Sequence, residues 1–289
     1  MARDPRLFGF TRARWTLEML DEVLDFLSLT SRSGLHGLLK RLDIVWKRGR
    51  DHVHSPDVSY ERKRAEVARV IAESMADPED VIVVYQDEVT IYRQPTVSYA
   101  YCTRGHEEQP TTDRSHHSNT MTRIAAALNH RTGQVVYHRV ARMSIDQLVK
   151  FYKMVCESYP KARRIYMIQD NWPIHVHIDV LSALEPQETA FLQQVPKSWP
   201  IIPSVRAEKR WGDWQLPIQL IPLPTYASWL NPIEKLWRRM KQEIIHHHRL
   251  AHDLVGFRQE IDHFLGKYAE PSPDLLRYVG LGSTDLIAA

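Results

Sequence analysis

Three acidic residues stand at the ends of apolar segments in this sequence. Asp87 and Asp170 each follow a short β-rich run that predicts a buried strand. Glu234 stands in the first turn of a helix that begins near Pro232. Carboxylates gathered from such positions are the oxygen ligands that Mg²⁺ prefers. Two such ions, about 3.5–4 Å apart, activate a water or a 3′-hydroxyl for attack on a phosphodiester.

The start of this helix allows a second interpretation of Glu234. Asn231 suits the N-cap and Pro232 the first helical position, where a missing N–H costs no hydrogen bond. Glu234, three residues after the cap, then fits a capping box. The two roles compete for one carboxylate, and the presence of Asp87 and Asp170 favours the metal-ligand role.

The elements that must position these acids mix strands and helices. Predicted strands cover residues 81–86, 90–94, 97–103, 121–129, 134–139, 164–169 and 218–221; predicted helices cover 60–76, 175–184, 232–248 and 254–268, and another begins at Ser144. Residues 185–217, with five prolines and three tryptophans, predict an ordered but irregular insertion. Its tryptophans suit either stacking on DNA ends or a small satellite core.

The N-terminal part differs in charge from the rest of the chain. Residues 1–50 carry ten lysines and arginines against six acids, whereas the other 239 residues carry 28 against 29. Leucine spacing predicts two short helices around a polar turn, which is typical of a helix-turn-helix. Such a basic head favours DNA contact, and a helical hairpin that only packs on the body is the alternative. The cations expected at phosphates are Arg32, Lys40, Arg41, Lys47 and Arg48.

These changes of pattern predict the domain boundaries. We expect a helix-turn-helix domain at 1–56, a linker helix at 57–79, a catalytic domain at 80–270 and a C-terminal tail at 271–289. The composition, 43% hydrophobic and 25% charged, is that of a soluble globular protein. No apolar run is long enough to span a membrane, and the two cysteines are far apart, with no metal-type spacing. A reducing cytoplasm is therefore the expected location.

Three blocks of the sequence resemble the signature blocks of DDE transposases, and the mariner-like bacterial insertion-sequence branch in particular. They are Gln86-Asp87-Glu88, Gln169-Asp170-Asn171-Trp-Pro-Ile-His175 and Leu230-Asn231-Pro232-Ile233-Glu234-Lys-Leu-Trp237, of which the last is the most specific. The resemblance covers roughly residues 80–250. It implies an α/β fold of the ribonuclease-H-like type, in which a mixed five-stranded sheet is flanked by helices.

The resemblance also implies a function. A DDE transposase binds the terminal repeats of its element, cleaves DNA strands at the ends and joins the freed 3′-hydroxyls to target DNA. Asp87, Asp170 and Glu234 would form the catalytic triad and hold two Mg²⁺ or Mn²⁺ ions. Asn171 and His175 match motif positions beside the site, where they would orient a metal ligand or a phosphate, or have a structural role. The implied partners are double-stranded DNA and, on DNA, a second copy of the chain, at the bacterial nucleoid.

Other charged residues lie near the three acids in the sequence. Lys235, Arg238 and Arg239, on the helix of Glu234, are candidates for phosphate contact or form a solvated helix face. Glu88 should point away from Asp87, because successive strand residues alternate between faces, so we assign it a structural role.

A histidine tract at 246–248 resembles a metal site by composition. Consecutive residues of a helix, however, fan out around its axis and do not converge on one ion.

Two departures from the family pattern bear on function. Glu234 follows Asp170 by 64 positions, well beyond the spacing of compact relatives, and the surplus matches the insertion at 185–217. Relatives carry two helix-turn-helix units, whereas only one fits into residues 1–56, so we expect a short form or a chain that lacks an N-terminal part. Two rival functions follow: a DNA-binding remnant or repressor whose nuclease is unused, and a ribonuclease-H-like nuclease without strand transfer.

Overall fold

The computed structural model describes residues 3–27, 31–45, 54–102, 109–189 and 195–282. The chain forms two compact units, Met1–Val53 and His54–Ala289, called unit 1 and unit 2 below. Within the described residues, no helix has both the length and the apolar character needed to cross a membrane.

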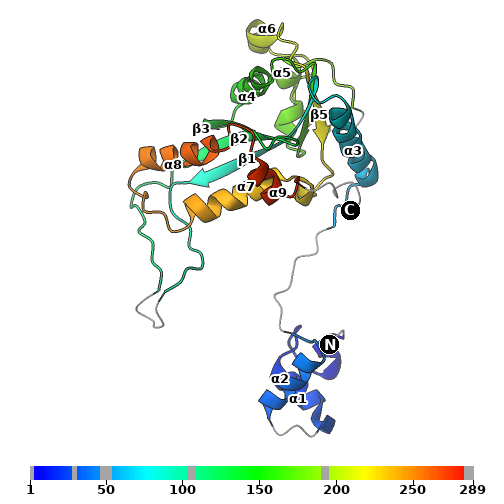
Figure 1. The fold of residues 1–289 in the computed structure, drawn as a ribbon, viewed down its shortest axis with the longest axis vertical. Helices are drawn as coiled ribbons and strands as arrows, with labels where there is room; N and C mark the ends of the chain where they lie inside the picture. The colour runs from blue at the N-terminus through cyan, green and yellow to red at the C-terminus, as the bar shows by residue number, and fades with distance from the viewer. Residues whose placement is uncertain (1–2, 28–30, 46–53, 103–108, 190–194, 283–289) are drawn as a thin grey trace. The chain divides into compact units, whose positions relative to one another are not determined.

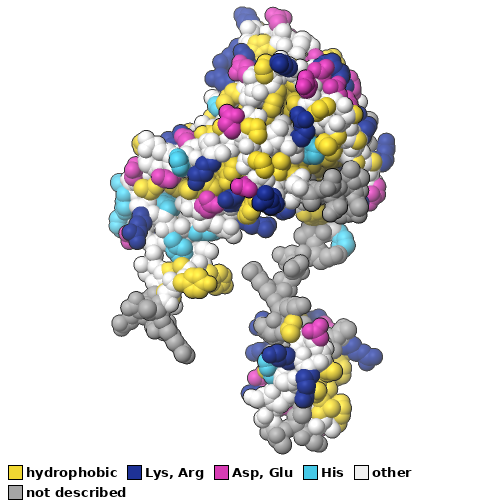
Figure 2. Space-filling model, viewed as in Figure 1, with side chains coloured by type: hydrophobic (Ala, Val, Ile, Leu, Met, Phe, Trp, Pro, Cys, Tyr) yellow, Lys and Arg dark blue, Asp and Glu magenta, His cyan; other side chains and the backbone are white. Residues whose placement is uncertain are grey.

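Unit 1 is built from short helices. They are the 3-10 helices η1 (Pro5–Phe8) and η2 (Asp25–Leu27) and the α-helices α1 (Leu17–Val23) and α2 (Arg32–Arg41). Thr16 and Ser31 start α1 and α2 by accepting hydrogen bonds from backbone N–H groups in the first turn. Leu20 and Leu35 are buried where the two helices meet. Figure 2 shows lysine and arginine side chains on the visible face of unit 1 beside a hydrophobic patch.

Unit 2 is organised around a five-stranded mixed sheet with the order β3-β2-β1-β4-β5 (Figure 1). The strands are β1 (Val81–Tyr92), β2 (Met121–Asn129), β3 (Val135–Val140), β4 (Arg164–Gln169) and β5 (Ile218–Pro222). β4 runs parallel to both β1 and β5, whereas β2 runs antiparallel to both β1 and β3. This topology is the mixed five-stranded sheet that the resemblance implies.

Helices cover both faces of the sheet (Figure 1), and each face has its own hydrophobic core. The α7 face carries α3 (Tyr60–Ala76), α7 (Ile233–Met240), α8 (Leu254–Gly266) and α9 (Pro273–Val279); the α4 face carries α4 (Ile145–Ser158), α5 (Ile178–Leu181) and α6 (Val205–Trp211). Alternation along β1 feeds both cores, since Val83 and Tyr85 pack on the α7 face and Ile82 and Val84 on the α4 face.

β1 is longer than predicted, and Asp87 lies within it rather than after it. The parallel pairing of β1 with β4 ends at Tyr85, but its antiparallel pairing with β2 continues to Tyr92. The sequence predicted a strand that stops at Gln86, because a change of pairing partner leaves no local signal. The separate strand predicted beyond residue 96 is also wrong, since residues 97–102 are not in a strand.

The segment predicted as a C-terminal tail contains helix α9. The Ser272 side chain caps it, Pro273 occupies its first position and Gly280, at φ 86°, ends it. Leu275 and Val279 are buried in the core of the α7 face. A helix of seven residues offers only two turns of periodicity, which is too little to recognise in the sequence.

The chain enters unit 2 by binding to the loop that precedes α7. Ser55 Oγ donates to Thr225 O at 2.6 Å, and the Asp57 carboxylate accepts from Thr225 N at 2.9 Å and pairs with Lys63 Nζ at 2.9 Å. The side chains of Asp57 and Lys63 are 8% and 10% exposed. Burial would raise the pKa of Asp57, but hydrogen bonds from Lys63 and Thr225 lower it to about 2. The ion pair is therefore present across the physiological pH range.

Candidate active site

Asp87 lies on the α7 face of the sheet. Its Oδ2 accepts a hydrogen bond of 2.8 Å from Nε1 of Trp237, which is on α7 and 2% exposed. Burial raises the pKa of Asp87, and the nearby carboxylate of Glu234 raises it further. The Trp237 hydrogen bond opposes this, and Glu88 and Asp170 add to the rise, so that the pKa is about 7.

Glu234 occupies the first turn of α7, as predicted, and its side chain is largely exposed. Partial burial raises its pKa, Asp170 raises it as well, and the cations Lys241 and Arg238 lower it. Asp87, Asp170 and Glu234 therefore interact electrostatically, although they come from β1, β4 and α7.

Asn231 does not cap α7, so the capping-box interpretation is wrong. Its Nδ2 instead donates to Gln86 O on β1 at 3.0 Å, and α7 begins at Ile233 without a side-chain cap. Asn231 is buried and thus ties the start of α7 to the strand residue beside Asp87. Asn231, which was predicted to cap α7, instead links α7 to β1 of the sheet.

Asp170 directly follows β4, as predicted. Its Oδ1 accepts from Trp172 N at 2.9 Å and lies 3.5 Å from His175 Nε2. Burial would raise the pKa of Asp170, but the contacts with His175 and Trp172 lower it overall. Asn171, the next residue, donates from Nδ2 to Leu223 O at 2.7 Å and so joins the ends of β4 and β5.

His175 lies beneath Asp170 in a 3-10 turn, η3 (Pro173–Val176), and is 1% exposed. Its Nε2 is 3.6 Å from Glu88 Oε2. Burial would lower the pKa of His175, but Glu88 and Asp170 raise it to about 9, so the ring is cationic at neutral pH. Glu88 points to the face opposite Asp87, as alternation predicted. Its carboxylate nevertheless contacts His175, the same ring that contacts Asp170.

Two groups of side chains therefore lie near the end of β4, one made of Glu88, Asp170 and His175 and the other of Asp87 and Glu234. One ligand atom each from Glu88, Asp170 and His175 lies within 4.8 Å of the others. Asp87 and Glu234 approach from the α7 face. Together these carboxylates offer oxygen donors that fit a hard divalent cation.

The cations predicted to contact DNA have different surroundings. Lys47 and Arg48 lie outside the described residues. Arg32 pairs with Glu18 at 3.3 Å within unit 1, and Lys40 and Arg41 are exposed in the last turn of α2.

On α7, two of the three predicted cations are engaged with neighbouring side chains or backbone. Lys235 Nζ donates to Val279 O, at the end of α9, at 2.7 Å. Arg239 pairs with Glu243 at 2.7 Å. Arg238 is exposed, and its charge acts on Glu234.

The histidine tract lies beyond the helix rather than on it. α7 ends at Met240, a π-helical turn follows at Lys241–Ile245, and the chain becomes extended at His246. His246 Nδ1 contacts Thr96 Oγ1 at 2.8 Å, His247 Nε2 contacts the backbone of Ser98, and His248 stacks on Phe257. Within the described part of the chain, the three rings belong to no metal-binding group.

The tryptophans of the insertion include packing residues. Trp211, on α6, is buried and donates from Nε1 to Asp179 O at 2.7 Å. Lys153 Nζ lies 4.5 Å from the ring centre of Trp214, which packs against the same core. These contacts favour packing over stacking on DNA, but the core that Trp211 and Trp214 join is that of the α4 face rather than a separate satellite core.

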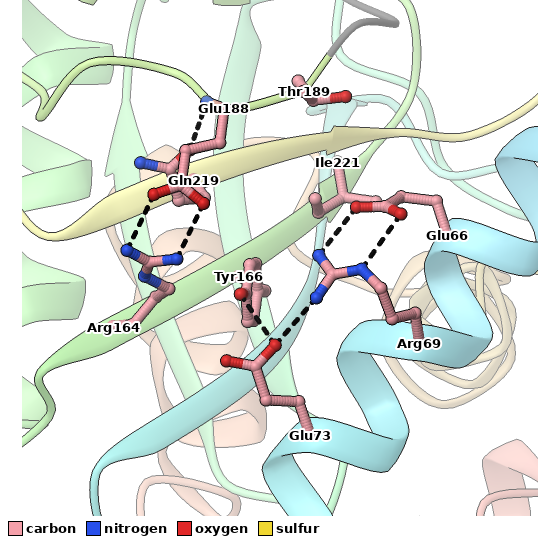
Figure 3. Close-up of a pocket in the computed structure, with 9 residues that line it drawn as sticks. All are labelled: Glu66, Arg69, Glu73, Arg164, Tyr166, Glu188, Thr189, Gln219 and Ile221. Carbon is pink, nitrogen blue, oxygen red and sulfur yellow. Dashed lines mark hydrogen bonds and ion pairs between the residues drawn. The ribbon is translucent and has the colours of Figure 1, made fainter.

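A polar pocket of about 330 Å³ lies between α3 and the β4–β5 edge of the sheet (Figure 3). Arg69 bonds to Glu66 and Glu73, and Tyr166 also donates to Glu73. Across the pocket, Arg164 pairs with an acid of the insertion at 2.8 Å. Both guanidinium groups are paired with carboxylates, Arg69 within α3 and Arg164 with Glu188. The hydrogen bond from Tyr166 to Glu73 ties α3 to the sheet.

Comparisons with known proteins agree with this arrangement. A protein of Shigella sonnei, the insertion element IS630 uncharacterized 39 kDa protein, is 24% identical over 265 residues. The match covers 90% of this chain and 66% of that relative, so the chain spans just under two thirds of the relative's length.

Solved structures of Mos1 share the fold. The Mos1 mariner paired-end complex with Mn matches with a TM-score of 0.59 at 15% identity, over 96% of this chain and 74% of that one. The Mos1 strand transfer complex matches with a TM-score of 0.53 at 14% identity, over 96% and 73% of the two chains. This likeness confirms the predicted ribonuclease-H-like fold.

A family model described as DDE superfamily endonuclease matches residues 82–254. The matched region contains β1, β4 and α7, and with them Asp87, Asp170 and Glu234. Since it spans more than half of the sequence, this chain belongs to the DDE superfamily endonucleases.

Proposed function

We propose that this protein is a DNA transposase that cleaves the ends of its element and joins them to target DNA. The observation that carries the proposal is the joining of the elements that bear Asp87, Asp170 and Glu234: β1 pairs with β4, and Trp237 and Asn231 tie α7 to β1. Family membership supports it, as do the relative from an insertion element and the neighbours whose names describe transposon-end complexes.

The residues present fit divalent cations. Asp87, Asp170 and Glu234 offer oxygen ligands whose mutual repulsion a cation relieves, and Mg²⁺ and Mn²⁺ favour such ligands. Two bound ions would activate a water or a 3′-hydroxyl and stabilise the leaving oxygen of the phosphodiester. Trp237 and Asn231 hold Asp87 and the start of α7 in place for this purpose.

The cations near the acids suit the DNA backbone. Arg238 and Lys241 act on Glu234 from α7 and the π-helical turn, and an approaching phosphate would meet both. In unit 1, the exposed Lys40 and Arg41 at the end of α2 suit phosphate contacts beside a groove. We propose double-stranded DNA as the partner and, because two ends are processed together, a homodimer on DNA.

A cleavage and joining assay tests the function. The substrate is a duplex that ends with the inverted repeats flanking the gene, with a supercoiled plasmid as target and Mn²⁺ as cofactor. The proposal expects nicks at the element ends and joined products from the wild-type protein, and neither from Asp87→Asn. Cleavage without joining indicates a nuclease alone, and equal products from both proteins contradict the proposal.

A further inference from the structure

Asp170 and Asp87 are supported by different neighbours, and the support of Asp170 comes from the α4 face. His175 Nε2 lies 3.5 Å from Asp170 Oδ1 and 3.6 Å from Glu88 Oε2. The imidazole is 1% exposed, whereas the side chain of Asp170 is 56% exposed. The buried ring of His175 thus contacts two carboxylates: that of Asp170, which faces solvent, and that of Glu88.

Hydrogen bonds fix the orientation of the imidazole ring. The Tyr152 hydroxyl donates to Gln169 Oε1 at 3.1 Å, so its oxygen is left to accept the N–H of His175 Nδ1 at 3.0 Å. All three side chains are buried. Because Nδ1 is occupied as a donor to Tyr152, the ring must direct Nε2 at Glu88 and Asp170.

Glu88 is fixed in the same manner from its other side. Gln86 Nε2 donates to Glu88 Oε1 at 2.7 Å, and Gln86 is fully buried. Glu88 therefore offers Oε2 to His175 from β1, and Asp170 offers Oδ1 from the end of β4. The ring bridges two strands whose parallel pairing has ended at Tyr85.

We propose that Glu88 and His175 form a positioning pair that holds the carboxylate of Asp170 in place for its role as metal ligand. The inference rests on the proposed function, since it concerns one of the three acids of that site. The pair would act through Asp170 rather than on the substrate. Without the pair, the hydrogen bond from Trp172 N would still hold Oδ1, but nothing from the α4 face would support this exposed carboxylate, and ordering it fully would cost side-chain entropy on metal binding.

The alternative is that His175 is itself a ligand, since its donor atom and the two carboxylates lie within 4.8 Å of one another. Mg²⁺, however, prefers oxygen and keeps several of its waters. The nitrogen of His175 is buried, so an ion bound there would have no room for its waters. The exposed side of Asp170 leaves room for them. The positioning role therefore agrees better with the burial of the ring.

Manganese binding to the metal-free protein tests the proposal without relying on activity. Free Mn²⁺ is followed by electron paramagnetic resonance during titration of wild type, Glu88→Gln, His175→Gln and the double variant. We expect each single variant to weaken binding by about 10-fold to 100-fold, the usual effect of losing a partner of a metal ligand. The double variant should cost little more than the worse single variant, because the two residues act as a pair.

A matched control removes an ion pair elsewhere. Arg139 and Asp262 form a partly buried pair at 2.6 Å between β3 and α8, and Asp262→Asn should change Mn²⁺ affinity by less than about twofold. Circular dichroism monitors folding of each variant. Glu88→Gln keeps the size of the side chain and its bond from Gln86, so it tests the pair even where His175→Gln unfolds the protein.

The outcomes separate the two levels of inference. If Asp170→Asn weakens Mn²⁺ binding but Glu88→Gln and His175→Gln bind like wild type, the positioning pair is overturned and the proposed function stands. If Asp87→Asn and Asp170→Asn also bind like wild type, the proposed metal site itself is wrong. Electron spin echo modulation from an imidazole nitrogen that His175→Gln abolishes would make His175 a ligand, and this too overturns the positioning role.

Discussion

The two faces of the sheet support the acids of one candidate site in opposite ways. On the α7 face, Asp87 receives one neutral hydrogen bond from Trp237, and neighbouring carboxylates raise its pKa to about 7. On the α4 face, the buried charge of His175 helps to lower the pKa of Asp170. Asp87 therefore carries repulsion that a bound cation would relieve, whereas Asp170 is compensated before any cation binds.

This difference teaches that the acids of one candidate site can differ in how far their charges are compensated before any cation binds. Asp170 is ionised over the whole neutral range, so it is ready to bind a cation. Asp87 is about half protonated near pH 7, so a cation must compete with the proton for its carboxylate. The two acids should thus respond differently to mutation, metal and pH.

The largest expected effect follows from removing either acid. Asp87→Asn and Asp170→Asn should each lower the rate of strand cleavage on the order of 1000-fold, because several kcal/mol of transition-state stabilisation are lost. Gel assays with Mn²⁺ measure the rate. Glu243→Gln, which removes an exposed carboxylate paired with Arg239, is the control and should stay close to wild type. A fully active Asp170→Asn would mean that the two faces do not form one site.

Trp237→Phe sharpens the comparison on the α7 face. It removes the N–H that holds Asp87 Oδ2 and keeps most of the aromatic packing. We expect the Mn²⁺ concentration for half-maximal cleavage to rise roughly 10-fold. Trp211→Phe is the matched control, since its Nε1 donates to Asp179 O away from the acids. An equal rise in both variants would assign the effect to general loosening of the fold.

The two faces should also differ in how their acids affect the pH dependence of stability. The folded pKa of Asp87 is about 7 and the unfolded value about 4, so between these values the folded protein holds a proton that the unfolded chain lacks. Stability from this group therefore falls as pH rises from 4 to 7. Metal-free Asp87→Asn should melt above wild type at pH 8, by about 2–4 °C for each kcal/mol relieved.

The same experiment contains its own checks. The two melting curves should converge as the pH falls below about 4, where Asp87 becomes protonated in the unfolded chain as well. Asp170→Asn should not melt above wild type at pH 8, because its folded pKa is lowered. Mn²⁺ should stabilise the wild-type protein and not Asp87→Asn. A stabilised Asp170→Asn would remove the contrast between the faces.

The smallest expected effect concerns the two asparagines of the signature blocks. Asn231 donates to Gln86 O from a buried position, and Asn171 donates to Leu223 O from a partly buried one. Losing a donor to a buried carbonyl costs about 1–3 kcal/mol. Asn231→Ala should therefore lower the melting temperature more than Asn171→Ala in calorimetry. The reverse order would show that the tie between β4 and β5 matters more than the tie to α7.

Local signals predicted much of the fold and the positions of two of the three candidate acids. Asp170 follows a buried strand and Glu234 follows a helix-starting proline, and both features are visible within a few residues of sequence. The five strands of the sheet also have strong local patterns. Asp87 was recognised, but its place inside β1 was not, because the strand continues by pairing with β2, whose residues lie far along the chain.

Contacts between distant residues account for what sequence reasoning missed. Glu88 was assigned a structural role, and its contact with His175, 87 positions later, depends on the parallel pairing of β1 and β4. Trp237 stands in the sequence only as the last residue of a signature block, and nothing local indicates that its N–H binds Asp87. Asn231 was read as a cap because its bond to Gln86 crosses 145 positions. In each case the side chain's type was informative, but its partner was not local.

The attachment of Ser55 and Asp57 to Thr225 has a mechanical consequence. A force applied to the chain at residue 54 reaches unit 2 first through the hydrogen bonds of Ser55 and Asp57, before it reaches the first turn of α3. The load is carried to Thr225, nine positions before Glu234 in the sequence. A pull at residue 54 would thus act on the loop that leads to Glu234, and the buried pair of Asp57 with Lys63 would resist it.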